Sequence, residues 1–162
     1  MFRVGILTVS DKGATGDRQD TAGPALTQIL DPRCFEAARY QIVPDEYEEI
    51  VAALVSWSDQ EKLDLILTAG GTGPAPRDLT PEATLAVAER LVPGLAEAMR
   101  TAGLAKTPHA MLSRGVAVIR GKTLIINLPG SLKGATESLE AILPALPHAL
   151  EKLTGSPADC GT

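Results

Sequence analysis

Aromatic residues are scarce in this chain of 162 residues, since Phe, Trp and Tyr together make up only 3% of it. The chain is nevertheless 44% hydrophobic, so its core has to be built mainly from Ala, Val, Ile and Leu. Small aliphatic side chains are the usual filling of buried parallel strands flanked by helices. The composition therefore favours an α/β domain. A length near ~150 residues predicts a single domain that buries about two-thirds of its unfolded surface.

Cysteine and histidine are also rare. Cys34 and Cys160 are far apart and match no metal-ligand spacing, which predicts one half-buried thiol and one thiol near the carboxyl terminus, in a reducing cytoplasm. His109 and His148 have no nucleophile or metal-ligand partner at a suitable spacing, so we interpret both as structural or solvent-facing. With no Cys/His pair and no G-x-S-x-G turn, hydrolase and thiol chemistry have no support in the sequence.

A basic surface and a long apolar segment are both missing. The net charge of -5 and the pI near 5.0 argue against a nucleic-acid or membrane-surface partner, because either requires a clustered basic face. No apolar run approaches the ~20 residues of a membrane span, and the first residues, MFRVGILTVS, lead straight into a strand pattern. We therefore expect a cytoplasmic protein that is not exported.

Hydrophobic periodicity predicts one domain, residues 1–153, followed by a flexible tail of small and polar residues, 154–162. Strands are expected at residues 2–9, 35–43, 63–71, 116–119 and 123–128. The last two are too close for a crossover helix and must pair as an antiparallel hairpin. A mobile loop is expected at 12–20, and helices at 20–30, 45–57, 81–92, 93–105, 133–143 and from 144 onward, where prolines interrupt the last helical pattern.

Capping patterns predict the starts of two helices. Asp45, with Glu48 three residues later, has the arrangement of a capping box, although a metal or ligand role is compatible with the same position. Thr80 is expected to cap the next helix, with Leu85, Ala88 and either Leu91 or Val92 on its buried face.

Polar, glycine-rich loops follow three of the predicted strands: TVSDKG, TAGGTGPAPRD and NLPGSLKG. Ligands of open α/β sheets bind outside the carboxyl ends of the strands, so these loops are expected to meet there. The AGGTG stretch matches neither the dinucleotide fingerprint nor the phosphate-binding P-loop. Gly70, Gly71 and Gly73 either form a tight turn or bring backbone amides close to an anion, and the neighbouring Arg77 and Asp78 favour the second interpretation.

The loop LPGSLKG repeats this chemistry at a second place. Gly130 and Gly134 free the backbone, Ser131 offers a hydroxyl, and Lys133 supplies a cation at the start of a helix. This set suits a phosphate or carboxylate. A serine that only caps the following helix is the alternative explanation.

Backbone amides, Arg77, Lys133 and two acidic residues, Asp45 and Asp78, together predict an anion-binding site. Carboxylates beside an anion are expected where a divalent cation lies between them, because Mg²⁺ is usually held by one or two carboxylates and substrate phosphates. The residues therefore favour phosphoryl or nucleotidyl transfer.

Five stretches, GILTVSD, TAGGTGPAPRDLTPEAT, AMLSRG, IRGKTLIINLPGSLKG and EAILPALPHAL, resemble the molybdopterin adenylyltransferase (MogA/MoaB-like) family of molybdenum cofactor biosynthesis. The similarity runs from Gly5 to about Leu150. It implies a three-layer molybdopterin-binding domain with a mostly parallel sheet, usually a homotrimer. It also implies Mg²⁺-dependent adenylylation of molybdopterin with ATP as co-substrate, release of pyrophosphate, and a molybdenum insertase as the next partner.

The resemblance also assigns roles to individual residues. Asp45 and Asp78 match the essential acids of the family, and we expect them to organise Mg²⁺ and phosphate. The pocket is expected to be formed by Ser10, Asp11, Gly70, Gly71, Thr72, Gly73 and Arg77. Phosphate or pterin groups are expected to be held by Ser113, Arg114, Pro129, Gly130, Ser131, Lys133 and Gly134.

Two other functions are compatible with the same fold. A catalytically silent molybdopterin-binding or carrier protein needs amides and cations but no acids at the phosphate. A generic nucleotide-binding domain binds nucleotides without selecting a pterin. The presence of both Asp45 and Asp78 favours the enzyme.

Overall fold

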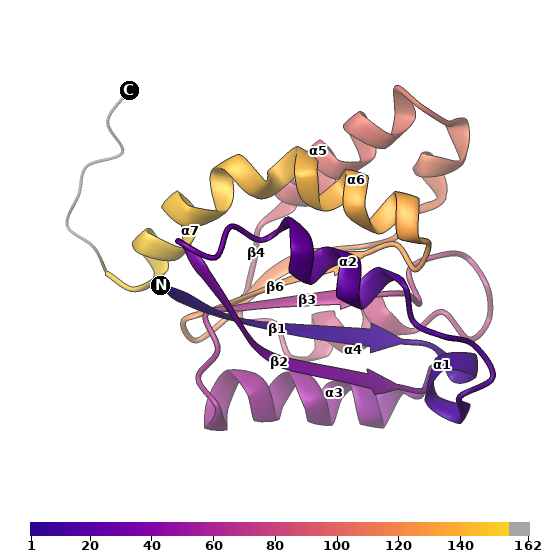
Figure 1. Cartoon of the computed structure of the whole chain (residues 1–162), viewed down its shortest axis with the longest axis horizontal. Coiled ribbons are helices and arrows are strands. Elements are labelled where there is room, and N and C mark those ends of the chain that lie inside the picture. Colours follow the sequence, from indigo (N-terminus) through magenta and orange to yellow (C-terminus); the bar gives the residue numbers. More distant parts are fainter. Residues whose placement is uncertain (156–162) are drawn as a thin grey trace.

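The computed structural model describes residues 1–155, which are built around a six-stranded sheet in the order β2-β1-β3-β6-β5-β4 (Figure 1). The four strands β2, β1, β3 and β6 are parallel to one another. β5 pairs antiparallel with β6, and β4 pairs antiparallel with β5. The strands are β1 (Phe2–Val9), β2 (Phe35–Val43), β3 (Leu65–Ala69), β4 (Arg90–Leu91), β5 (Ala117–Arg120) and β6 (Thr123–Leu128). The expected α/β fold with a mostly parallel sheet is confirmed.

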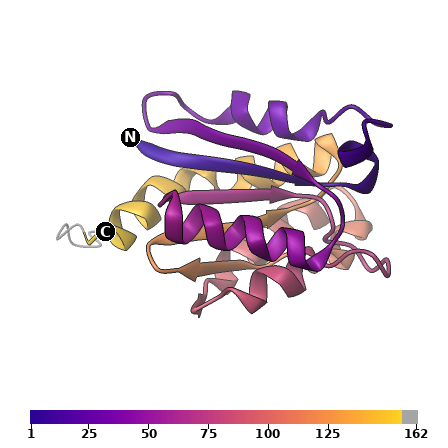
Figure 2. The ribbon, with the colours of Figure 1, turned by 90° about the horizontal axis from the view of Figure 1, so that it is seen from below.

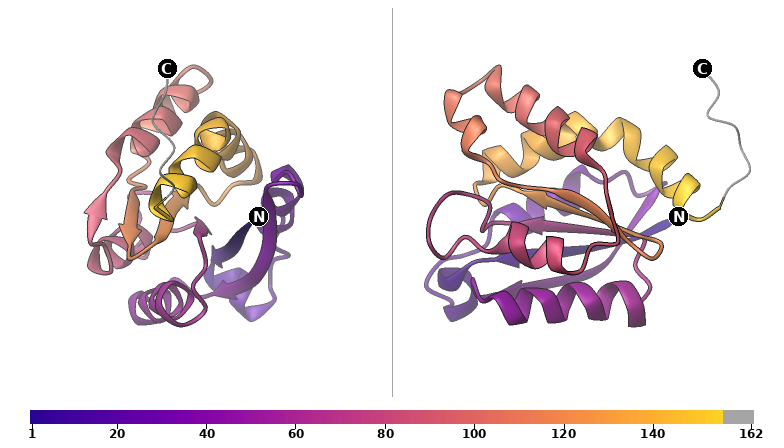
Figure 3. Two further views of the ribbon diagram at one scale, coloured as in Figure 1. Left: turned by 90° about the vertical axis from the view of Figure 1, so that its left-hand side faces the viewer. Right: turned by 180° about the vertical axis from the view of Figure 1, so that it is seen from behind.

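Helices cover both faces of the sheet and give three layers, seen along the strands in the left view of Figure 3. One face carries α2 (Ala22–Ile29), α5 (Pro93–Leu104), α6 (Leu132–Ile142) and α7 (Leu146–Leu153). The other carries α3 (Tyr47–Val55), a π-helical turn (Ser56–Gln60) and α4 (Thr80–Ala86). Figure 2 views the molecule from this second side, with α3 in front of the strands. No helix among the described residues is long and apolar enough to cross a bilayer.

The central strands are apolar on both faces because both faces are covered. All five residues of β3 and all six of β6 are buried. Trp57 is buried against β1, where a Cβ on Gly5 would lie only 2.6 Å from its ring. The aliphatic residues that predicted the strands therefore form much of the core. The ring of Trp57 fits against β1 because residue 5 is a glycine.

The predicted hairpin is present, and it carries an extra strand. β5 and β6 are joined by a two-residue turn in which Gly121 has a φ of 56°. On its other edge β5 pairs with the short strand β4, which the helical pattern had not predicted. Leu91 therefore lies on an edge strand and is 62% exposed, and Leu85 on α4 is 45% exposed, so the expectation that these leucines face inward is wrong. Ala88 and Val92, the alternative to Leu91, do pack against the core.

Two helix starts also differ from the predictions. The first turn after β1 is a short helix, α1 (Asp11–Thr15), in a segment expected to be a mobile loop. Ser10 caps it by accepting a hydrogen bond from the amide of Gly13 at 3.1 Å. Thr80 does not cap α4 but is its first residue, and its side chain is fully buried.

The last helical segment is interrupted near Pro144, as the positions of the prolines predicted. A 3₁₀ turn (Leu143–Ala145) separates α6 from α7, so Pro144 lies between two helices. Thr154 and Gly155 form a turn after α7, and the rest of the predicted flexible tail, with Cys160, lies outside the described residues. Cys34 is a free, half-buried thiol, as expected.

Candidate functional site

The three glycine-rich loops meet at the carboxyl ends of β1, β3 and β6, as predicted. The amide of Gly70 donates to the carbonyl of Leu128 at 3.1 Å, and a Cβ on Gly130 would lie 3.1 Å from the Cα of Gly70. The loop after β3 protrudes at this end of the sheet, opposite the amino terminus and α7 (Figure 3, right). Two cavities open here.

The larger cavity has a volume of about 700 Å³ and lies between the loops after β1, β3 and β6. It contains seven of the predicted site residues: Ser10, Asp45, Gly70, Gly71, Asp78, Gly130 and Ser131. Sequence reasoning missed the part of its wall that precedes α2, namely Arg18, Gln19, Asp20 and Thr21, together with Thr8 on β1. The polar composition of residues 16–20 was the available signal, and it predicted only a mobile loop.

The glycine turn after β3 has both a structural and a ligand-facing role. Gly70 has a φ of 110°, and a Cβ there would lie 2.2 Å from the carbonyl oxygen of Val9, so only glycine fits. Gly71 has a φ of 65°, and a Cβ there would lie 2.3 Å from Thr80 Oγ1 and 3.3 Å from Asp45 Oδ1. The missing side chain at Gly71 thus leaves space between a buried hydroxyl and a carboxylate.

Asp45 is held by Asp11 rather than by its own helix. Its Oδ2 accepts from the amide of Asp11 at 2.8 Å, while its own amide donates to Asp11 Oδ1 at 3.0 Å. The predicted capping box is therefore wrong, because Glu46 occupies the cap position of α3 without a side-chain capping bond. Within residues 1–155, Asp45 Oδ1 accepts no hydrogen bond.

Burial and neighbouring charge disfavour ionisation of Asp45. Its pKa is raised above the ordinary value of 3.8, mainly by desolvation and then by the negative charges of Asp11 and Asp78. A cation placed beside these carboxylates would remove that penalty.

Arg77 is held by the carboxylates of Asp11 and Glu46. Its Nε donates to Asp11 Oδ2 at 2.7 Å, and its Nη2 donates to Asp11 Oδ1 and to Glu46 Oε1, both at 2.9 Å. These bonds raise the pKa of Arg77 and, together with the Asp45 amide, lower the pKa of Asp11. Neither Arg77 nor Asp11 lines either cavity. The pair joins the loops after β1, β2 and β3 and holds Asp45 in place.

Arg114 supports the glycine loop in a similar way. Its Nε donates to the carbonyl of Gly73 at 2.8 Å and its Nη2 to the carbonyl of Asp78 at 2.6 Å, while Nη1 pairs with Glu82. Asp78 in turn accepts from the amide of Ala75 at 3.0 Å through Oδ2, and its Oδ1 makes no hydrogen bond to another described residue. Arg114 thus fixes the loop that presents Asp78.

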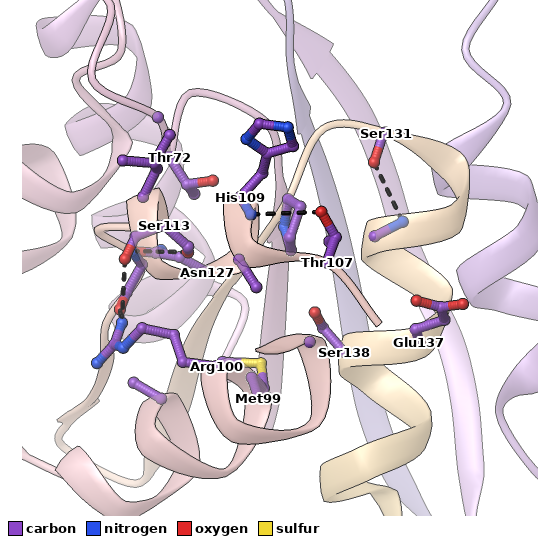
Figure 4. Close-up of a pocket in the computed structure, with 18 residues that line it drawn as sticks. Thr72, Met99, Arg100, Thr107, His109, Ser113, Asn127, Ser131, Glu137 and Ser138 are labelled. Carbon is purple, nitrogen blue, oxygen red and sulfur yellow. Dashed lines mark hydrogen bonds between the residues drawn. The ribbon is translucent and has the colours of Figure 1, made fainter. Parts of the chain in front are cut away.

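The smaller cavity, of about 280 Å³, lies between α5, α6 and the 3₁₀ helix η2 (Pro108–Leu112) (Figure 4). Thr72, Gly73, Ser113, Pro129, Ser131 and Gly134 were predicted to bind ligand and line it. The helical part of its wall was not predicted, and its surface is mostly apolar, with Ala96, Met99, Gly103, Ala110 and Leu112 beside Arg100, His109, Glu137 and Ser138. His109 is exposed, as expected, but it also lines the cavity.

Ser131 lines both cavities and caps α6 by accepting from the amide of Gly134 at 3.1 Å. The capping interpretation of this serine is confirmed, and it places the amino terminus of an 11-residue helix where the cavities meet. Lys133 is exposed and lines neither cavity, and its side chain has no hydrogen bond or ion pair within residues 1–155.

Comparison with known proteins gives one consistent family. A model described as a probable molybdopterin binding domain matches residues 5–148. The molybdopterin adenylyltransferase of Helicobacter pylori is 42% identical over 157 residues, covering 96% of this chain and 89% of its own length. The Escherichia coli protein of the same name is 44% identical over 147 residues, covering 89% and 75%.

A solved structure agrees with both relatives. The molybdopterin biosynthesis enzyme MoaB from Thermus thermophilus is 64% identical, superposes with a TM-score of 0.92, and covers 98% of this chain and 100% of its own. Because the family model spans residues 5–148 and relatives of more than 40% identity cover most of the chain, the chain belongs to the molybdopterin-binding family of molybdenum cofactor biosynthesis.

Proposed function

We propose that this protein adenylylates molybdopterin, transferring AMP from ATP to the terminal phosphate of the pterin and releasing pyrophosphate. The observation that carries the proposal is the meeting of two unlike cavities at Ser131. One is lined by three carboxylates and a glycine turn, whereas the lining surface of the other is mostly apolar and includes one carboxylate, that of Glu137. A reaction between two phosphorylated substrates needs two sites that share the point of transfer.

The nucleotide belongs in the larger cavity. Its volume of about 700 Å³ suits a nucleoside triphosphate better than the 280 Å³ of the other. The amide of Gly71, which lines this cavity, donates no hydrogen bond within residues 1–155, so it is available to a phosphate oxygen. The amides of Thr72 and Gly73, which line the smaller cavity, also donate none within these residues.

Molybdopterin belongs in the smaller cavity, with its ring system against the apolar wall. Its terminal phosphate then reaches Ser131 and the first amides of α6. Leu132 and Lys133 lie in the first turn of this helix, where amide groups lack intrahelical acceptors and favour an anion. Ser113, whose carbonyl accepts from Arg100 at 3.3 Å, lies on the same wall.

The donor set around Gly71 fits Mg²⁺. Asp45 Oδ1 and Asp78 Oδ1 have no hydrogen-bond donors within the described residues, and the buried Thr80 Oγ1 has no partner there. No cluster of three or more His, Cys, Asp or Glu side chains in residues 1–155 is arranged to hold a metal by itself. Mg²⁺ needs only one or two carboxylates when substrate phosphates complete its coordination. When bound there, it would neutralise the phosphate oxygens during transfer.

The chemical step makes one bond and breaks another. An oxygen of the pterin phosphate attacks the α-phosphorus of ATP, and the bond from that phosphorus to the bridging oxygen breaks as pyrophosphate leaves. The protein positions the two phosphates rather than forming a covalent intermediate. Ser131 and α6 orient the attacking phosphate, while the glycine turn holds the α-phosphate near Asp45 and Asp78.

We infer a cytoplasmic homotrimer that passes its product to a molybdenum insertase. Exposed apolar side chains support self-association: Leu91, Leu104, Met111 and Leu112 are between 45% and 62% exposed. An activated nucleotide adduct requires a consumer that displaces AMP, which supports a downstream insertion step.

Product formation from molybdopterin, ATP and Mg²⁺ tests the function. We expect adenylyl-molybdopterin and pyrophosphate from the wild-type protein, and a loss on the order of 100- to 1,000-fold in Asp45→Asn and Asp78→Asn. Asp64→Asn, at the opposite end of β3, is the control for removal of an acid and should keep its rate. Pterin binding without product from the wild type would instead support the carrier function.

A further inference from the structure

The charged side chains that line the larger cavity are mostly acidic. Asp20, Asp45 and Asp78 contribute carboxylates, and Arg18 is the one basic residue among the described residues of its wall. ATP brings a strongly negative triphosphate into this space. A divalent cation between two of the acids offsets part of that charge, but the phosphates beyond it need a further cation.

The basic residues that the sequence indicated are not placed to fill this need. Arg77 is held by Asp11 and Glu46, and Arg114 by Glu82 and two carbonyls. Moving either guanidinium to a substrate would break the contacts that hold the loops of Asp45 and Asp78. Arg18, by contrast, is exposed and has no side-chain hydrogen bond or ion pair within residues 1–155.

The backbone that carries Arg18 is anchored on its amino-terminal side. Gly16 ends α1 with a φ of 81°, which turns the chain back over the helix. The amide of Arg18 then donates to the carbonyl of Lys12 at 3.1 Å. The position of the Arg18 Cα is therefore set by α1, and α1 is itself capped by Ser10 in the same cavity wall.

Asp20 anchors the segment on the other side. Its Oδ2 accepts from Thr8 Oγ1 and from Tyr40 Oη, both at 2.6 Å, and its Oδ1 accepts from the amides of Ala22 at 3.0 Å and Gly23 at 3.2 Å. This carboxylate joins β1, β2 and α2. The charge of Asp20 is thus compensated by these four donors. Arg18 lies two residues earlier, at the cavity wall, and forms no ion pair with Asp20.

We propose that Arg18 binds the β- and γ-phosphates of the nucleotide in the larger cavity, and so stabilises the leaving pyrophosphate. The inference rests on the proposed function, in which the α-phosphate lies by the glycine turn and Ser131. The remaining two phosphates then lie in the part of the cavity that Arg18 lines. A guanidinium donates two parallel hydrogen bonds to phosphate oxygens, and charge that develops on the leaving group strengthens them.

Calorimetric binding of ATP, pyrophosphate and AMP to Arg18→Gln tests this assignment in the full-length protein. We expect the affinities for Mg-ATP and pyrophosphate to fall about 10-fold, AMP affinity to change less than about 2-fold, and Arg18→Lys to recover part of the loss. Lys12→Gln removes the same charge from the exposed side of α1, outside the cavity, and should bind all three ligands like wild type.

Unchanged affinity for ATP and pyrophosphate in Arg18→Gln would overturn the proposal. An equal loss for AMP would place Arg18 at the α-phosphate or nucleoside and would overturn it as well. Because these are binding measurements, they are independent of product formation. A wild-type protein that binds ATP through Arg18 but makes no product would refute the adenylylation and the role in pyrophosphate release, and would leave Arg18 as a ligand of the β- and γ-phosphates.

Discussion

The larger cavity is lined mainly by loop residues at strand ends, whereas the smaller one is walled by α5, α6 and η2. In the first, carboxylates are fixed by other polar groups, as Asp45 is by Asp11. In the second, most of the lining surface is apolar, although Arg100, His109 and Glu137 also line it. The difference indicates a division of labour in which one cavity provides charge for the chemistry and the other provides shape for a ring system.

Filling the smaller cavity should separate the two roles most strongly. Ser138 on α6 is half-buried and lines this cavity, so Ser138→Phe places a phenyl ring in a space of about 280 Å³. We expect the KM for molybdopterin to rise about 30-fold while the KM for ATP stays within about 2-fold. Steady-state kinetics with each substrate varied in turn measures both.

Glu140→Phe is the matched control, because Glu140 lies two residues further along α6 on its exposed side. Thermal unfolding of both variants shows whether the added ring disturbs the core. A rise in the KM for ATP instead of that for molybdopterin would reverse the assignment of substrates to cavities.

The two cavities also differ in how far the sequence predicts them. Residues of the larger cavity follow strands that the aliphatic runs predict, so Asp45, Asp78 and the glycines could be placed together from the rule that loops meet at strand ends. The smaller cavity depends on the packing of α5 against α6, which are separated by a hairpin. No local pattern indicates that Met99 and Ser138 share a cavity.

The errors in the prediction have a common physical cause. A capping pattern is local. The carboxylate of Asp45 accepts from the amide of Asp11, 34 residues away, instead of from an amide of its own helix. At Thr80 the surrounding core buries the side chain, so the helix begins at this residue and its hydroxyl caps nothing. Leu91 follows a helical pattern in the sequence, but in the structure it pairs with β5 as part of β4. Tertiary contacts overrode local propensity in all three places.

Removing the side chain that holds Asp11 and Asp45 should affect only the larger cavity, and the expected change in rate is smaller than the change in KM expected from Ser138→Phe. Arg77→Gln removes the paired hydrogen bonds to Asp11, so the Asp11–Asp45 pair loses its anchor. We expect kcat to fall about 10-fold and the Mg²⁺ concentration for half-maximal rate to rise, with molybdopterin affinity unchanged. Rates measured across a Mg²⁺ series test this.

Arg33→Gln removes a similar exposed pair, with Asp31, far from the site and should leave the Mg²⁺ dependence unchanged. If Arg77→Gln instead raises the KM for ATP at an unchanged Mg²⁺ requirement, Arg77 binds the nucleotide directly, as the sequence had suggested.

The smallest expected effect is a pH-dependent change in the free energy of unfolding, caused by altering the hydrogen bonds of Asp20 in the wall of the larger cavity. Burial opposes ionisation of Asp20, but hydrogen bonds from Thr8, Tyr40 and two amides outweigh it and hold its pKa below the ordinary 3.8. A lowered pKa in the folded state contributes stability above the unfolded value, and this contribution is lost as the pH falls through the folded value. Tyr40→Phe removes one of these bonds.

We therefore expect Tyr40→Phe to lower the free energy of unfolding by about 1 kcal/mol at pH 7, a modest value for a bond to a charged group because Tyr40 is 47% exposed. The difference from wild type should shrink below pH ~4, as Asp20 becomes protonated, when urea unfolding is compared at pH 7, 5 and 3. Tyr47→Phe, on α3 and without a side-chain hydrogen bond within the described residues, should show little difference at any pH. A Tyr40→Phe deficit that stays constant down to pH 3 would mean that the hydroxyl stabilises the fold by packing, and that the charge of Asp20 does not organise the wall that carries Arg18.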